Sequence, residues 1–133
     1  MSDSKPTKLL ISLDNLERAL QRLGEALKEP SDNSLLIDGT IQRFEFAIEL
    51  LWKTLRRALL VEGIEINTPR EALIESYQIH WLEEEAIWLS MLKDRNETSH
   101  VYNEEKAREI YDRIHDYYGE MTKVLRLLIE RYR

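Results

Sequence analysis

One stretch of eight residues carries most of the side chains that could do chemistry. It reads Arg95-Asn96-Glu97-Thr98-Ser99-His100-Val101-Tyr102. An arginine guanidinium is permanently charged and fits a phosphate, and a histidine imidazole can move a proton near neutral pH. Together they could cleave RNA without a metal ion, the histidine taking the 2′-hydroxyl proton while the arginine stabilises charge on the phosphate. Arg95 and His100 are therefore candidate catalytic residues, and Asn96 is a supporting residue that orients one of them.

The spacing of Arg95 and His100 sets a condition on the backbone between them. On a continuous helix, five residues separate two side chains by about 140° around the axis, so the two groups point apart. They converge only if the helix breaks between them or if two copies of the chain face each other. Thr98 and Ser99 have modest helix propensity, which favours a break.

The Arg-x4-His pattern is weak when it stands alone. The chain has 12 arginines and three histidines in 133 residues, so chance supplies roughly 0.3 such pairs. The alternative interpretation is a structural helix cap with a surface histidine. Of the other histidines, His80 is expected to pack in a corner beside Trp81, and His115 is expected to be solvated.

A polar row on the second predicted helix has two interpretations. Residues at helical spacing in such a row usually form an exposed face with ion pairs. If the row were instead buried beside the octet, Arg43 or Lys53 could add a contact to a phosphate. The row consists of Gln42, Glu45, Glu49, Lys53 and Arg56.

Apolar residues recur at steps of three and four along most of the chain, which is the spacing of one face of a helix. Thr68, Pro69 and Glu71 have the types and spacing of a capping box at a helix start. Asn103 is a good N-terminal cap for the last helix, and Gly63 suits a helix C-terminus. The spacing and these signals predict helices over about residues 8–29, 35–62, 69–78, 83–94 and 104–131.

These segments predict an all-α fold, an antiparallel up-and-down four-helix bundle with one extra short helix. Residues 1–7 are expected to form a flexible tail, and residues 8–133 a single domain. The apolar stripes are longer than one small bundle is expected to bury, which predicts a homodimer.

Composition excludes several classes of function. No cysteine is present, which excludes disulfides, thiolate metal sites and cysteine nucleophiles and fits a cytoplasmic location. No stretch approaches the roughly 20 apolar residues of a membrane span, so no membrane partner is expected. The net charge of −6 disfavours nucleic-acid binding by the whole surface but leaves room for a local basic site. No metal and no cofactor is expected in the site.

Three blocks of the sequence resemble the nucleotidyltransferase substrate-binding family, which belongs to the HEPN superfamily and is close to the HepT-type toxins. They are residues 38–55, 68–71 and 94–103, and the resemblance covers about residues 8–128. It implies a helical bundle that dimerises and works with an MNT-type nucleotidyltransferase. In HepT-type members an Arg-x4-His-x-Tyr motif forms a composite ribonuclease site across the dimer, and this motif falls on Arg95, His100 and Tyr102.

The resemblance also implies a mode of regulation. In such pairs the nucleotidyltransferase can transfer AMP to the motif tyrosine, here Tyr102, and silence the toxin. In extended backbone, residues two apart point to the same side, so His100 and Tyr102 are expected to share one face just before the Asn103 cap.

Three functions stay open at this point. The first is a metal-independent endoribonuclease toxin silenced by its partner, and the intact Arg, His and Tyr set favours it. The second is a non-catalytic subunit that binds nucleotide or another substrate for the nucleotidyltransferase, which the acidic surface favours. The third is a dimerising scaffold in which the octet is only a helix cap.

Overall fold

Five α-helices account for most of the chain in the computed structural model, which describes residues 5–30, 33–98 and 103–133. No strand occurs in these residues, so the predicted all-α class is confirmed for them. The first helix starts at Lys5, three residues before its expected start at Lys8. The helices are α1 Lys5–Leu27, α2 Ser34–Val61, α3 Pro69–Gln78, α4 Glu85–Thr98 and α5 Glu104–Tyr132.

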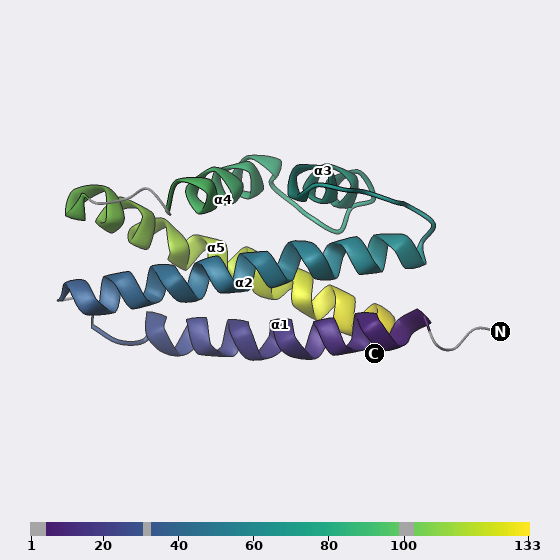
Figure 1. Ribbon diagram of the computed structural model, residues 1–133, viewed down its shortest axis with the longest axis horizontal. Helices are drawn as coiled ribbons and strands as arrows, with labels where there is room; N and C mark the ends of the chain where they lie inside the picture. Colours follow the sequence, from purple (N-terminus) through teal and green to yellow (C-terminus); the bar gives the residue numbers. More distant parts are fainter. Residues whose placement is uncertain (1–4, 31–32, 99–102) are drawn as a thin grey trace.

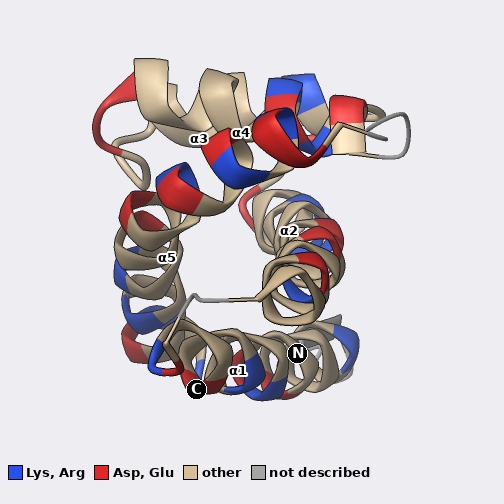
Figure 2. Cartoon of the chain, turned by 90° about the vertical axis from the view of Figure 1, so that its left-hand side faces the viewer, with Lys and Arg blue, Asp and Glu red and all other residues tan. Residues whose placement is uncertain are grey.

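The helices are arranged in three levels, which Figure 2 shows along the long axis of the molecule. Helices α2 and α5 lie in the middle, α1 covers them on one side, and α3 and α4 cover them on the other (Figure 1). Within the described residues, α1 contacts α2 and α5 but neither α3 nor α4. Helix α4, at whose end the octet begins, thus contacts α2, α3 and α5 within the described residues.

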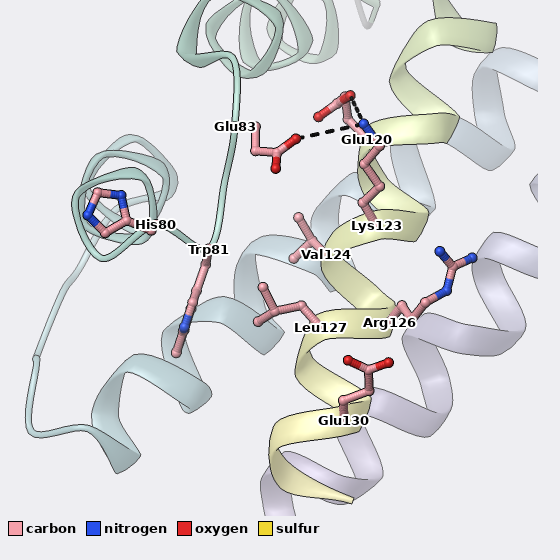
Figure 3. Close-up of a pocket in the computed structure, with 9 residues that line it drawn as sticks. All are labelled: His80, Trp81, Glu83, Glu120, Lys123, Val124, Arg126, Leu127 and Glu130. Atoms are coloured by element: carbon pink, nitrogen blue, oxygen red, sulfur yellow. Dashed lines mark hydrogen bonds and ion pairs between the residues drawn. The ribbon is translucent and has the colours of Figure 1, made fainter.

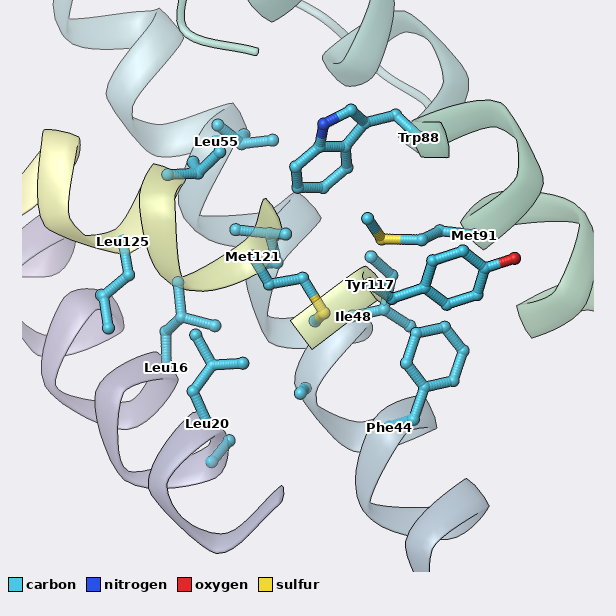
Figure 4. Close-up of a cluster of buried hydrophobic side chains, with 14 of the residues drawn as sticks. Leu16, Leu20, Phe44, Ile48, Leu55, Trp88, Met91, Tyr117, Met121 and Leu125 are labelled. Atoms are coloured by element: carbon cyan, nitrogen blue, oxygen red, sulfur yellow. The ribbon is translucent and has the colours of Figure 1, made fainter. Parts of the chain in front are cut away.

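The core follows the predicted apolar stripes. Helix α1 contributes five leucines that are at most 2% exposed, at positions 9, 13, 16, 20 and 23. Helix α4 contributes little by comparison, chiefly Trp88 and Met91, which lie among side chains of α2 and α5 (Figure 4). Phe44 of α2 and Tyr117 of α5 stack with their ring centroids 5.6 Å apart, and they close the core next to α4.

The predicted caps form, with one difference at α3. The Thr68 hydroxyl accepts a hydrogen bond from the Glu71 amide at 3.1 Å. The Glu71 carboxylate, however, accepts from the amide of Asn67 at 2.7 Å, one residue before the position that a capping box would use. The Asn103 side chain accepts from the amides of Glu105 and Lys106 at 2.7 and 3.2 Å, and so begins α5 as expected.

Two helices end in the same type of turn, with different residues at its left-handed position. After α2 this residue is Gly63, with φ of 85°, as the sequence predicts. After α3 it is His80, with φ of 68°, and the amide of Trp81 donates to the carbonyl of Ser76 at 2.9 Å. In such a turn the next residue packs inward. Trp81 is accordingly buried and His80 is exposed, so the expectation that His80 packs in the corner is wrong.

Candidate functional site

The first half of the octet is the last turn of α4. Arg95, Asn96 and Thr98 are helical, so the expected break between Arg95 and His100 does not fall within residues 95–98. Ser99 to Tyr102, which include the candidate base His100 and the candidate modification site Tyr102, lie outside the described residues. The geometry of the site is therefore that of Arg95 and its surroundings.

Arg95 is held by two neighbouring side chains and is partly exposed. Its Nη2 forms an ion pair with the Glu49 carboxylate of α2, and its Nη1 donates to the Asn96 side-chain oxygen at 3.2 Å. The Arg95 side chain is 36% exposed. Since a guanidinium has five N–H donors in a planar fork, these contacts leave donors for an anion on the exposed side. The contact places the Asn96 amide oxygen against the Arg95 guanidinium.

Two acids of the polar row on α2, Glu45 and Glu49, contact side chains of the octet. Glu45 and Glu49 are half-buried, and the Thr98 hydroxyl contacts the Glu45 carboxylate as well as the Arg95 carbonyl, the latter at 2.8 Å. The expectation of a wholly exposed face is therefore wrong for these two residues. Arg43 does not add a phosphate contact, because it turns to α1 and donates to the carbonyl of Arg22 at 2.6 Å.

A buried carboxylate anchors the end of α4 and was not found from the sequence. Asp94, only 3% exposed, accepts two hydrogen bonds of 2.8 Å from the Arg113 guanidinium and one of 2.5 Å from the Tyr117 hydroxyl. The hydroxyls of Tyr117 and Ser90 lie 2.5 Å apart. This network fixes the residue next to Arg95 against α5, so it sets the direction in which Arg95 leaves the helix.

The network changes the protonation of its members. Hydrogen bonding to Asp94 raises the pKa of Arg113 above its ordinary value, although partial burial acts against this rise. Burial, and then the hydrogen bond to Asp94, raises the pKa of Tyr117 to about 12. Both groups therefore keep their protons throughout the physiological range, and the anchor holds there.

One signal in the sequence could have revealed Asp94. Trp88 and Met91 are the buried face of α4, and the next position at that spacing is Asp94. An acid in an apolar stripe needs a buried partner. Arg113 and Tyr117, four residues apart on α5, were the available donors.

The cavity beside the octet has two acids in its lining, Asp38 and Glu45. It has a volume of about 270 Å³ and adjoins a second cavity of about 400 Å³, with which it shares Asp38 and Ala107. Carboxylates repel a phosphate, so this cavity does not favour the binding of an anion. The first cavity is lined by Asp38, Ile41, Gln42, Glu45, Thr98, Ala107 and Ile110.

Another cavity, of about 260 Å³, lies between the α3–α4 connection and α5 (Figure 3). Its central cation, Lys123, pairs with Glu83 at 3.8 Å and with Glu120 at 3.2 Å. None of the described octet residues lines this cavity. In the part of the chain that the structure describes, no three acidic or histidine side chains are placed to hold a metal ion. None of the helices in this part has an apolar stretch of the length that a membrane span needs.

The arrangement of helices defines a known structural class. A crystal structure from Thermus thermophilus matches with a TM-score of 0.81 and 35% identity, over 85% of this chain and 98% of that one. A Haemophilus influenzae structure matches with a TM-score of 0.79 and 30% identity, over 87% of this chain and 98% of that one. The latter is described as revealing the fold of a substrate binding domain of a nucleotidyltransferase.

The sequence comparison gives the family. Residues 11–130 match the family described as nucleotidyltransferase substrate binding protein like, and the chain belongs to this family. A Haemophilus influenzae protein named probable ribonuclease HepT is 28% identical over 137 residues, covering 91% of this chain and 94% of that protein. The resemblance that rested on three blocks of sequence is thereby confirmed.

Proposed function

We propose that this chain is the helical partner of an MNT-type nucleotidyltransferase and a metal-independent endoribonuclease, acting as a homodimer in a toxin–antitoxin-like pair. The family and the HepT-named relative support the pairing and the activity. The observation that carries the proposal is that the Arg95 guanidinium is held in place by its neighbours and is still partly exposed. Its neighbour Asp94 is bonded to α5, Glu49 and Asn96 contact its guanidinium, and 36% of its side chain is exposed.

In the proposed reaction Arg95 binds the scissile phosphate and His100 acts as the base. His100 takes the proton of the ribose 2′-hydroxyl, the 2′-oxygen forms a bond to phosphorus, and the bond from phosphorus to the 5′-oxygen breaks. The proton returns to the departing 5′-oxygen. The products are a 2′,3′-cyclic phosphate and a 5′-hydroxyl. Arg95 stabilises the charge that develops on the phosphoryl oxygens.

The test is cleavage of RNA by purified protein in the presence of a metal chelator. His100→Ala should lower the cleavage rate by at least about 100-fold, the lower bound for loss of a general base. His115→Ala is the matched control, because His115 is exposed on α5 and outside the proposed site. Circular dichroism should show unchanged helix content in both variants. Full activity in His100→Ala would refute the assignment, and loss of wild-type cleavage on chelation would refute metal independence.

We further propose that AMP transfer to Tyr102 silences the activity. The phenol oxygen attacks the α-phosphorus of ATP, a phosphodiester bond forms, and pyrophosphate leaves with the phenolic proton released to solvent. The added phosphate and base would repel and block an incoming RNA. Mixing the chain with its nucleotidyltransferase, ATP and magnesium should add one or more AMP masses, and Tyr102→Phe should abolish the addition. Tyr77→Phe is the control, because the Tyr77 side chain is exposed on α3. A gain of mass that persists in Tyr102→Phe would place the modification elsewhere.

A second function, a non-catalytic substrate-binding subunit, is favoured by the Glu49 carboxylate that already occupies Arg95. It predicts that the complex with the nucleotidyltransferase binds nucleotide while the chain alone cleaves no RNA. Nucleotide binding by the complex that persists in His100→Ala, together with no cleavage by the wild type, would favour this function over the first.

A further inference from the structure

One face of α2 carries three large apolar side chains that the fold leaves in solvent. Leu35, Phe46 and Leu60 are 84%, 64% and 60% exposed. At about 100° per residue, the three directions fall within an arc of roughly 40° on the side opposite the buried face of α2. The remaining large exposed apolar side chains among the described residues, Ile11 and Tyr77, lie singly on α1 and α3.

The charges of α2 are divided between its two halves. Its acids, Asp38, Glu45 and Glu49, all precede its bases Lys53, Arg56 and Arg57. The remaining base, Arg43, is turned to α1. Within the part of the chain that the structure describes, Lys53, Arg56 and Arg57 have no acidic partner, whereas Glu49 already pairs with Arg95.

This division identifies the kind of partner that fits the face. An antiparallel copy of α2 places the basic half of each helix against the half that carries Asp38 and Glu45, while a parallel copy places like charges together. The apolar residues also suit such a pairing, because Phe46 lies near the middle of the helix and Leu35 and Leu60 lie toward its two ends. The face is thus complementary to itself under a two-fold rotation.

We propose that the outer face of α2 is the surface on which a second copy of this chain docks antiparallel, about a two-fold axis close to Phe46. The proposal deepens the proposed function and rests on its homodimer. Glu49 lies at the edge of this face and holds Arg95. The two-fold axis therefore brings the two Arg95 side chains to one interface, where a composite site requires them.

The first experiment measures the dimer dissociation constant by light scattering and sedimentation. Phe46→Glu places two like charges close to the axis and should raise the constant at least about tenfold. Ile11→Glu introduces the same charge at a similarly exposed position on α1 and should change it less than about twofold. A monomeric wild type at micromolar concentration, or equal effects of the two variants, would overturn the proposal. So would a stable complex with the nucleotidyltransferase that Phe46→Glu abolishes while the dimer persists.

A second experiment tests the orientation. Lys53→Glu with Arg57→Glu removes attraction in an antiparallel pair and should weaken the dimer at least about tenfold. In a parallel pair it only replaces repulsion between bases by repulsion between acids, so an unchanged constant would overturn the antiparallel arrangement. These readouts are independent of RNA cleavage. A dimer that depends on Phe46 but cleaves no RNA would support this surface and refute the ribonuclease, whereas cleavage by a stable monomer would refute the surface.

Discussion

Replacing Asp94 with asparagine should destabilise the protein far more than the loss of an ordinary ion pair. The carboxylate is nearly fully buried and accepts three hydrogen bonds, two of them from a guanidinium. Breaking a buried pair by removing one partner costs about 3–5 kcal/mol. The Arg113 side chain is 42% exposed, so water compensates part of the loss. We therefore expect the free energy of unfolding to fall by about 2–3 kcal/mol, out of a total of about 5–15 kcal/mol.

The measurement is urea unfolding of a double-mutant cycle. Asp94→Asn, Arg113→Gln and the double variant should give a coupling energy of at least about 1.5 kcal/mol, because each single change leaves the other residue without its partner. The matched control is Lys106→Ala, which breaks the exposed pair with Glu97 at 3.6 Å and should cost under about 0.5 kcal/mol. Additive effects, or a coupling no larger than that of the exposed pair, would show that Asp94 does not anchor α4.

Two further predictions follow from the same region. The pKa of Tyr117 is about 12 in the folded protein and about 10 in an unfolded chain. The contribution of the Tyr117 hydroxyl to stability is therefore full below pH 10 and is lost as the pH rises from about 10 to 12. Over that range the free energy of unfolding of the wild type should fall by about 1–2 kcal/mol more than that of Tyr117→Phe. An equal fall in the two proteins would refute the link between the Tyr117 pKa and stability. Glu49→Gln removes the carboxylate that competes for Arg95. It should raise the affinity for a non-cleavable 2′-deoxy oligonucleotide about three- to tenfold in a fluorescence assay, whereas the control Glu130→Gln on α5 should leave the affinity unchanged. Unchanged binding by Glu49→Gln would mean that no anion reaches Arg95.

The parts of the fold that local sequence determines were predicted well. Helix starts at Thr68 and Asn103 and the end at Gly63 follow from hydrogen bonds between residues a few positions apart. The apolar stripes predicted that α1 and α2 each bury one face, because the helical period alone decides which side chains share a face; Phe46, which was expected to widen the apolar face of α2, is instead 64% exposed. His80 was misjudged because its backbone conformation, and not its side chain, is what the turn after α3 uses.

The surroundings of Arg95 could not be predicted in the same way. Glu49 looks like any exposed helix acid until α4 is placed beside α2, 46 positions further along the chain. Asp94 gave a weak signal as an acid in an apolar stripe, but its partners became evident only from the packing of α4 on α5. Polar contacts between distant segments depend on tertiary geometry, which sequence periodicity does not contain.

The anchoring of α4 by residues of α5 has a consequence for the order in which the chain folds during synthesis. Helices α1 and α2 can pair as soon as both have left the ribosome, since the two helices pack directly against each other. Helix α4 buries little apolar surface, and the groups that neutralise Asp94 arrive 19 and 23 residues later. Until Arg113 and Tyr117 have left the ribosome, Arg95 is carried on a helix whose Asp94 lacks its partners from α5. The packing of α5 against α4 is then the step at which the site acquires its shape.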